Sequence, residues 1–288
     1  MRIALIGATG QLGTDLKLRL PGEVAALGHD QIELRDEASI TQTLDALHPE
    51  IVINTAAYNL VDRAEDERKS ADEINTHGPR RLAEYCGRRD IVLVHFSTDY
   101  VFGLEGEKRV KPYVETDAPG PLSVYGTSKF GGEFCVLEAC SRHFIVRTCG
   151  LYGSAARRGA GKGNFIETML RLGTTRPELR VVNDQICTPT STADLAQAVV
   201  ELIASQRYGI YHATNSGQTN WFEFGSEALR LSGIQTPVIP ISTEEFGARA
   251  RRPPFSVLNC NKLASVIGRK LPDWRDALSR YLSERNQT

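Results

Sequence analysis

The sequence lacks an excess of charge of either sign, since 34 Lys and Arg stand against 35 Asp and Glu, for a net charge of −1. No long basic run or stripe is present, which argues against a nucleic-acid-binding surface. No apolar stretch approaches the ~20 residues that a membrane-spanning helix needs, and the apolar run after Met1 is too short for a signal peptide. We therefore expect a cytoplasmic protein with no membrane or nucleic-acid partner.

Cysteine is scarce and scattered. The six cysteines form no CxxC pair and no Cys/His spacing of the kind that binds zinc. This pattern favours reduced, mostly buried thiols over a disulfide framework, and it predicts no metal site. Hydrophobic residues make up 41% of the chain, which allows a sizeable core and argues against disorder.

The first half of the chain alternates short apolar strands with amphipathic helices. Strands without polar alternation are typical of a buried parallel sheet, and their alternation with helices predicts a Rossmann-like, doubly wound α/β fold. One long helix is expected over residues 66–88. The strands are expected at residues 3–6, 24–27, 51–53, 91–96 and 144–147.

The pattern loosens after about residue 150. We expect residues 1–150 to form a dinucleotide-binding Rossmann domain and residues 151–288 to form mainly a smaller α/β substrate-binding lobe. The two are expected to interleave, with later segments of about 179–215 completing the sheet. No Pro/Gly-rich linker separates them.

Three glycines follow the first strand with the spacing Gly7-x-x-Gly10-x-x-Gly13 and open the first helix. Such glycines permit a tight turn, the approach of a pyrophosphate to the backbone, and close packing of helix on strand. The helix N-terminus offers free N–H groups to the phosphates. An ordinary strand-to-helix turn is the alternative, but the context favours a dinucleotide. The same turn contributes Thr9, Gln11 and Leu12 as predicted cofactor contacts.

The end of the second strand bears on the choice between NAD and NADP. An acidic residue there would hold the ribose 2′-hydroxyl and repel a 2′-phosphate, but Gly28 occupies this place and His29 follows. NADP(H) is therefore favoured, while the nearby Asp30 keeps NAD(H) possible. Glu33 and Leu34 are also predicted cofactor contacts, although Leu34 fits a plain core position equally well.

Small and polar residues end the third and fourth strands. Ala56, Ala57 and Tyr58 follow the third strand, where small side chains leave room for a cofactor in the crevice of the sheet. Ser97 and Thr98 end the fourth strand at the same edge. The Thr98 hydroxyl could hydrogen-bond a substrate carbonyl, or it could simply cap the strand.

Tyr125 and Lys129 lie four residues apart, so on a helix they share one face. A neighbouring ammonium favours the phenolate, and lowering a tyrosine pKa from ~10 to ~7 takes about 4 kcal/mol. Such a tyrosine can exchange a proton with a substrate oxygen. A solvated helix face would be the ordinary explanation, but Thr98 and the glycine turn indicate one site for carbonyl reduction or hydroxyl oxidation.

Taken together, these motifs resemble the extended short-chain dehydrogenases/reductases, and more narrowly the dTDP-4-dehydrorhamnose reductases. The Ser-Thr-Asp-Tyr-Val-Phe and Asn-Asp-Gln strings are far more specific than the glycines. The matching segments span nearly the whole chain and comprise residues 7–13, 54–58, 61–65, 97–102, 125–129, 147–148, 163–165, 183–185, 188–190 and 250–253.

The resemblance implies a role for each matched position. It implies reduction of dTDP-4-dehydro-L-rhamnose to dTDP-L-rhamnose, with hydride delivered to C4. Tyr125 would be the proton donor, Lys129 would lower its pKa and hold the nicotinamide ribose, and Thr98 would orient the ketone. Asn75 and Ser97 would also contact the cofactor. Trp221 could instead be a core residue. The implied substrate contacts are Thr98, Asp99, Tyr100, Val101, Asn164, Gln185, Trp221 and Arg252.

Two positions depart from the family's pattern. Gly150 stands where the family has a pocket tryptophan, which leaves the exact sugar open, and Cys187 replaces a glycine. Some members bind Mg²⁺ at a dimer contact, but Asp15 is the one carboxylate here that matches, so no metal is assigned. A monomer and a homodimer both remain possible.

Two other functions stay open. An epimerase or dehydratase could share the fold, although a dehydratase would carry an Asp-Glu pair after the threonine, and here Tyr100 follows Asp99. The β-subunit of methionine adenosyltransferase also resembles this family, which allows a non-catalytic, NADP-binding regulatory subunit. The joint presence of Thr98, Tyr125 and Lys129 favours an active enzyme.

Overall fold

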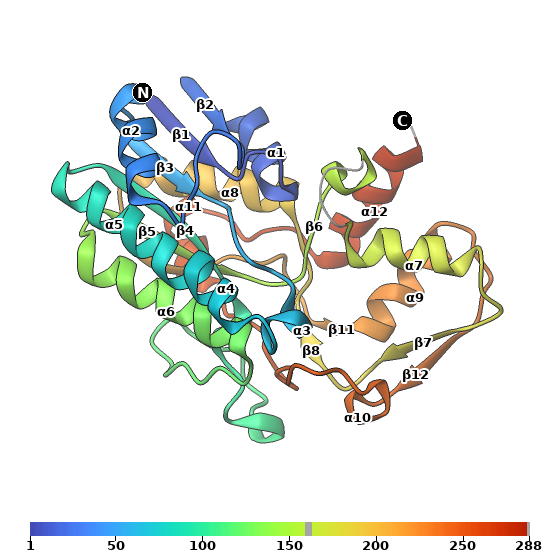
Figure 1. Ribbon diagram of the computed structural model, residues 1–288. Helices are drawn as coiled ribbons and strands as arrows, with labels where there is room; N and C mark the ends of the chain where they lie inside the picture. Colours follow the sequence, from blue (N-terminus) through green and yellow to red (C-terminus); the bar gives the residue numbers. More distant parts are fainter. Residues whose placement is uncertain (159–162, 287–288) are drawn as a thin grey trace.

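The computed structural model describes residues 1–158 and 163–286 (Figure 1). Within this part of the chain a six-stranded, all-parallel sheet has the order β10-β5-β4-β3-β1-β2, which confirms the predicted doubly wound α/β fold. The order reverses between β1 and β3, and that is where such sheets bind ligands. The strands are β1 (Arg2–Ile6), β2 (Glu23–Leu27), β3 (Ile51–Asn54), β4 (Val92–Thr98), β5 (His143–Thr148) and β10 (Gly209–His212).

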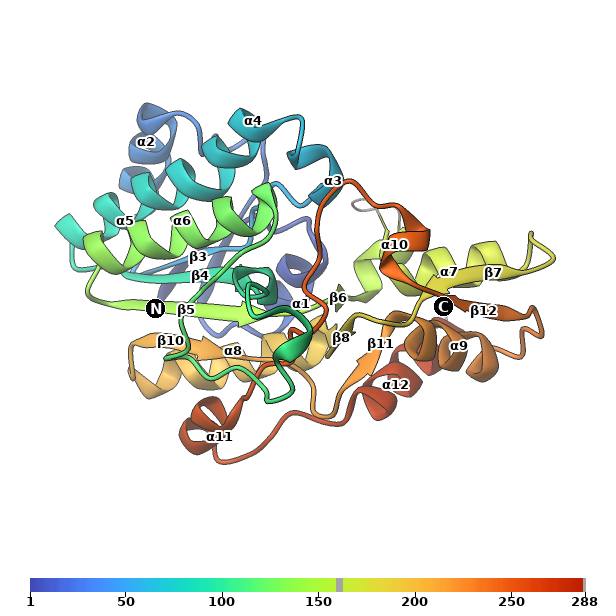
Figure 2. The ribbon, with the colours of Figure 1, turned by 90° about the horizontal axis from the view of Figure 1, so that it is seen from below.

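Helices cover both faces of the sheet, which is why its central strands are buried on both sides and mostly apolar. Alternate residues of β1 enter different cores, Ile3 and Leu5 on one face and Ala4 and Ile6 on the other. Figure 2 shows α6 and α8 on opposite sides. The first face is covered by α1 (Gln11–Arg19), α8 (Thr192–Ser205) and α11 (Asn261–Ile267), and the second by α2 (Glu37–Leu47), α5 (Gly78–Arg88) and α6 (Val124–Ala139).

The single helix expected over residues 66–88 is wrong in detail. A short α3 (Val61–Ala64) is followed by α4 (Arg68–Asp72), a π-helical turn (Glu73–His77) and then α5. Pro79 lies at the start of α5 and has no N–H to continue the regular hydrogen-bond ladder. The π turn directs the Asn75 amide inward, where it exchanges two hydrogen bonds of 2.9 Å with the backbone of Tyr58.

A second lobe extends from the carboxyl edge of the sheet (Figure 1). Its core is formed by residues of α7 (Phe165–Gly173), α9 (Trp221–Leu231) and α12 (Trp274–Asn286). Of the segment expected to complete the main sheet, β10 joins it, whereas β7 (Leu179–Val182) pairs in parallel with β12 (Val238–Ile241) in the lobe. The shorter elements are β6 (Leu151–Tyr152), β8 (Ile186–Cys187), β9 (Thr190–Ser191), β11 (Thr219–Asn220) and α10 (Thr243–Phe246).

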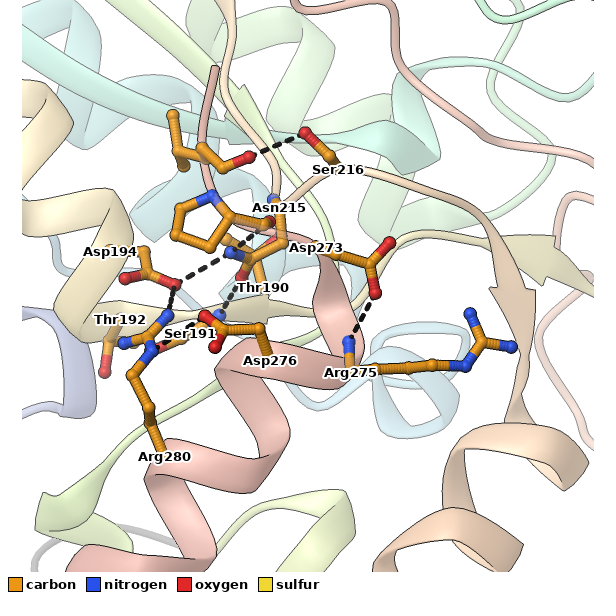
Figure 3. A network of polar contacts seen from close by, with 12 residues as sticks. Thr190, Ser191, Thr192, Asp194, Asn215, Ser216, Asp273, Arg275, Asp276 and Arg280 are labelled. Atoms are coloured by element: carbon orange, nitrogen blue, oxygen red, sulfur yellow. Dashed lines mark hydrogen bonds and ion pairs between the residues drawn. The ribbon is translucent and has the colours of Figure 1, made fainter. Parts of the chain in front are cut away.

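A partly buried polar network joins the lobe to the sheet-covering helix α8 (Figure 3). The Asn215 side chain accepts a hydrogen bond from the Ser191 backbone at 2.8 Å and donates to Asp194 and to the Pro272 carbonyl. Arg280 of α12 reaches the same Asp194 carboxylate at 2.7 Å. One amide therefore connects α8, β9 and the segment leading into α12.

Replacing Asn215 with alanine should lower the free energy of unfolding by about 2–3 kcal/mol, because buried partners lose their hydrogen bonds. Urea unfolding monitored by circular dichroism measures this. The control is Arg230→Ala, which removes an exposed ion pair with Glu227 and should leave the unfolding midpoint almost unchanged. Equal midpoints for the two variants would contradict the role of Asn215.

Candidate functional site

A cavity of about 300 Å³ lies at the carboxyl ends of the central strands, at the point where the strand order reverses. It is bounded by the glycine turn, by the ends of β3, β4 and β5, and by α6. Its lining residues are Gly10, Gln11, Leu12, Gly13, Thr55, Ala57, Asn59, Phe96, Ser97, Thr98, Tyr125, Lys129, Thr148, Gly150 and Leu151.

The glycine turn has the close approaches that its spacing predicts. Gly7 has a φ of 76°, and a Cβ there would lie 2.7 Å from Thr55 Oγ1. A Cβ on Gly13 would lie 2.3 Å from the Gly7 carbonyl oxygen, so helix α1 packs directly on the turn. Gly10 precedes α1 without a side-chain cap, which leaves the first N–H groups of the helix for an anion. This cradle fits the pyrophosphate of a dinucleotide.

Gln11 and Thr9 have different surroundings in this turn. The Gln11 side-chain oxygen accepts hydrogen bonds from the Gly153 backbone at 2.9 Å and from the Asn164 amide at 3.1 Å, so Gln11 joins the turn to the second lobe. Thr9 is exposed. Their contacts with a cofactor remain predictions.

Polar and charged side chains gather beyond the end of β2. Glu33 lies between His29, at 3.6 Å, and Arg35, at 2.8 Å. The Arg35 guanidinium hydrogen-bonds the Glu33 carboxylate and lowers its pKa to about 2. Leu34 is buried in the core of the α5 face, so the structure places it with the core residues. Arg35 was not predicted, because only its contact with Glu33 distinguishes it from other surface arginines.

Some residues after β3 line the cavity, and others form hydrogen bonds within the protein. Ala57 lines the cavity, as does Asn59, which the sequence did not single out. Ala56 donates its backbone N–H to Asn54 Oδ1 at 3.1 Å. The Tyr58 hydroxyl donates to Glu67 at 2.6 Å, so its phenol is occupied by a contact of its own.

Thr98, Tyr125 and Lys129 all line the same cavity. Thr98 ends β4, and α6 begins after Ser123, whose side chain caps it by accepting from the Gly126 backbone at 3.1 Å. A Cβ on Gly126 would lie 2.4 Å from the Tyr100 carbonyl oxygen. The absent side chain therefore lets α6 approach the turn after β4, which brings the Tyr125 phenol within hydrogen-bonding reach of Thr98.

The ionisation of Tyr125 differs from the expectation. Burial raises its pKa to about 12, against the opposing hydrogen bond of Thr98, so the predicted lowering by Lys129 is wrong for this structure. The Lys129 ammonium instead donates to the Phe96 carbonyl at 2.6 Å. Burial lowers the pKa of Lys129 to about 8, with Glu133 acting against the shift. At pH 7 the phenol is therefore protonated, as a proton donor must be.

Several predicted substrate residues have strong partners within the protein. Arg252 makes a bidentate ion pair with Asp62 of α3, at 2.7 and 3.0 Å. Gln185 donates to the Thr243 hydroxyl at 2.8 Å, and Asn164 caps α7. The structure brings none of these three into the cavity lining described above. Their contacts with a substrate remain predictions.

The turn after β4 holds the remaining predicted substrate residues. Tyr100 packs edge-on against Tyr125, with ring centroids 5.8 Å apart. Val101 is fully buried in a small core with Phe102. Asp99 is 2% exposed and hydrogen-bonds other residues of the chain.

Gly150 stands where the family pattern has a tryptophan, but another tryptophan, Trp221, lies beside it. Its φ is 53°, and a Cβ there would lie 3.0 Å from Trp221 Cη2 and 3.2 Å from Pro189 Cα. The Trp221 indole, which also packs on Phe165, thus lies against Gly150, a residue of the cavity lining, although Trp221 is not itself part of that lining. An aromatic ring reaches Gly150 from α9, where the family pattern places one at position 150.

Asp15 is unsuited to a metal in this structure. It is buried, and its carboxylate accepts hydrogen bonds from Thr192 and Arg19. Across residues 1–158 and 163–286, no group of three or more His, Cys, Asp or Glu side chains could hold a metal ion. In the same residues no helix has both the length and the apolar character to cross a bilayer.

The parallel sheet, the glycine cradle and the cavity with its threonine, tyrosine and lysine define an oxidoreductase of the extended short-chain dehydrogenase/reductase class. Residues 1–287 match the family described as RmlD substrate binding domain. The chain is 40% identical to the spore coat polysaccharide biosynthesis protein SpsK of Bacillus subtilis, covering 99% of this chain and 98% of that protein.

Two further relatives carry the name of the family that the sequence motifs resemble. The dTDP-4-dehydrorhamnose reductase of Escherichia coli is 35% identical over 99% of this chain and 98% of its own. The crystal structure of dTDP-4-dehydrorhamnose reductase from Bacillus anthracis in complex with NADP superposes with a TM-score of 0.92, at 38% identity, over 98% of this chain and 99% of that one. The chain belongs to the dTDP-4-dehydrorhamnose reductase family, as its motifs predicted.

Proposed function

We propose that this enzyme reduces the C4 ketone of a dTDP-linked 4-keto-6-deoxy sugar, dTDP-4-dehydro-L-rhamnose, to give dTDP-L-rhamnose. The observation that carries the proposal is the meeting of Thr98, Tyr125 and Lys129 in one cavity beside the glycine cradle. The relatives named above support the choice of substrate. The Trp221 indole, which lies against Gly150, supports a sugar pocket of the family type.

When bound, NADPH supplies the hydride for C4, and the glycine turn and the N-terminus of α1 would hold its pyrophosphate. The chain's own groups control the proton. The buried Tyr125 phenol donates its proton to the oxygen that becomes negative as the ketone is reduced. The Lys129 ammonium, which lines the same cavity, stabilises that developing negative charge. The Thr98 hydroxyl orients the ketone oxygen toward Tyr125.

The experiment mixes the purified enzyme with the 4-keto sugar nucleotide and follows the absorbance of NADPH, and separately of NADH, at 340 nm. We expect oxidation of NADPH that depends on the sugar, and dTDP-L-rhamnose as the product. Tight NADP binding without oxidation would contradict the proposal and favour a regulatory subunit. An epimerised sugar formed without net cofactor oxidation would favour an epimerase.

For the cofactor, we propose that NADPH is preferred over NADH, because Gly28 replaces the acid that would repel a 2′-phosphate. Arg35 lies beyond the end of β2, where it pairs with Glu33, and its guanidinium can donate hydrogen bonds to that phosphate.

Arg35→Ala should therefore lower kcat/KM for NADPH about tenfold and leave that for NADH nearly unchanged. The ratio of the two initial rates at low cofactor concentration measures the effect. Arg80→Ala, which breaks a similar exposed pair with Glu84 on α5, is the control and should change neither value. A parallel loss with both cofactors in Arg35→Ala would remove Arg35 from the phosphate site.

A further inference from the structure

Asp99 is a buried carboxyl group to which the proposed reaction assigns no task. It follows Thr98 directly, and its side chain is 2% exposed. Within the described residues Asp99 forms no ion pair. The partly or fully buried ion pairs of the chain use other carboxylates, among them those of Glu133, Asp62 and Asp194. Burying a carboxyl group without a cation is costly, so a purely structural role would be served as well by a neutral side chain.

The oxygens of Asp99 have specific partners on two sides. Oδ1 accepts from the Thr98 hydroxyl at 3.1 Å, and Oδ2 accepts from the Ser256 hydroxyl at 2.6 Å. Ser256 is buried and lies 157 positions away in the sequence, where its backbone donates to the Ile186 carbonyl at 2.9 Å. A chain of hydrogen bonds thus runs from Ser256 through Asp99 to Thr98, which lines the cavity together with Tyr125.

The hydroxyl of Thr98 has one proton to give, and this limits what it can do. It accepts from the Tyr100 backbone N–H at 3.2 Å, and while Asp99 is ionised it donates to Asp99. In that state Thr98 has no proton for a ketone oxygen. If Asp99 carries a proton, Asp99 can donate to Thr98, and the Thr98 proton is free to turn toward the cavity.

We propose that Asp99, held by Ser256, is a positioning residue whose protonation state sets the direction in which the Thr98 hydroxyl donates. The inference rests on the proposed ketone reduction and adds two residues to it. The protonated form of Asp99 is the productive one, because it allows both Thr98 and Tyr125 to donate to the ketone oxygen. The proton that the substrate keeps still comes from Tyr125.

The surroundings of Asp99 agree with this role. Burial raises its pKa, while hydrogen bonds from Ser256, Cys149 and Thr98 oppose the rise. The titratable groups that face it are Tyr125 from α6, Cys149 after β5 and Tyr100 from its own turn. Cys187 of β8 faces Cys149 behind it. None of these side chains is a cation at neutral pH, so none of them stabilises the ionised Asp99 carboxylate by electrostatic attraction.

The test is the pH profile of kcat for wild type, Ser256→Ala and Asp99→Asn in the sugar-dependent oxidation of NADPH. We expect kcat in wild type to fall as pH rises through the pKa of Asp99. Ser256→Ala removes a hydrogen-bond donor to the ionised Asp99 carboxylate, so the pH at which kcat falls should rise by about one unit. Ser256→Thr, which keeps a hydroxyl, should return that pH to the wild-type value. Asp99→Asn should abolish the fall. KM should stay within about twofold throughout.

Ser216→Ala is the matched control, because it deletes a hydroxyl that donates at 2.6 Å to the Leu271 carbonyl, far from Thr98 in the chain. It should leave the pH profile unchanged. If Ser256→Ala and Asp99→Asn both showed the same pH profile of kcat as wild type, the inference would be overturned, even if both variants were less stable. A rise in KM with an unchanged profile in Asp99→Asn would instead make Asp99 a substrate contact.

Carbon-13 NMR of aspartate-labelled protein provides a reading that does not depend on turnover. The carboxyl signal that disappears in Asp99→Asn belongs to Asp99. Its pKa should lie above the range of ordinary aspartates, and Ser256→Ala should raise that pKa further. A signal that titrates like a free aspartate would also overturn the inference. A wild-type enzyme with this NMR signature that reduces no 4-keto sugar nucleotide would contradict the proposed function and, with it, the assigned task of Asp99.

Discussion

Tyr125→Phe is expected to lower kcat at least ~10²-fold while leaving NADPH binding nearly intact, because it removes the proton donor and little else. The phenol is protonated at neutral pH, since burial raises its pKa to about 12. It lines the cavity together with Thr98. Steady-state kinetics and fluorescence titration with NADPH separate turnover from binding.

Tyr113→Phe is the matched control for this experiment. The Tyr113 hydroxyl is also buried, and within the described residues it has no hydrogen-bond partner. Its removal should change neither kcat nor cofactor affinity. If Tyr125→Phe kept more than about a third of wild-type turnover, another group would have to deliver the proton.

Lys129→Met should lower kcat by ~10² to 10³-fold and at the same time make the protein more stable at pH 7. The substitution removes the positive charge that stabilises the negative charge developing on the ketone oxygen. Lys129 is also a buried cation whose pKa falls from 10.5 to about 8 on folding, which costs about 3 kcal/mol at neutral pH. Methionine fills the same space without that cost.

The sign of the pH dependence follows from the direction of this shift. Between pH 8 and 10.5 the unfolded chain holds the Lys129 proton and the folded chain does not, so wild-type stability gains from rising pH there. The difference in unfolding free energy between Lys129→Met and wild type should shrink over the same interval. Urea unfolding at pH 7 and pH 10 measures it.

Lys262→Met serves as the control, because Lys262 also donates to a backbone carbonyl, that of Ile210, but lies outside the cavity lining. It should show neither the loss of turnover nor the gain in stability. A lysine with a purely structural role at position 129 would give the opposite result, a less stable protein with nearly normal turnover.

Local sequence patterns were sufficient for the sheet and for the glycine turn. Apolar runs without alternation mark buried parallel strands wherever they occur, and the spacing of Gly7, Gly10 and Gly13 depends only on neighbouring residues. The order of Thr98 and Tyr125 along the chain placed both at the same sheet edge. These features could be predicted because each is determined within a few residues.

Features that depend on distant partners could not be predicted in this way. Leu34 packs in the core because Gly78 leaves room beside it, and Asp99 meets Ser256 from a segment 157 residues away. The pKa of Tyr125 follows its burial, and the Lys129 ammonium faces the Phe96 carbonyl. The sequence shows that tyrosine and lysine share a helix face, but only the packed structure shows what each one contacts.

The most direct test of the central claim is transfer of the hydride itself. The enzyme is incubated with dTDP-4-dehydro-L-rhamnose and NADPH that carries deuterium at nicotinamide C4, with the two cofactor epimers used separately, and the product is examined by NMR. We predict dTDP-L-rhamnose with deuterium at sugar C4 from one epimer, formed by wild type and suppressed in Tyr125→Phe. A product without deuterium at C4 from either epimer, or no product at all, would contradict the account.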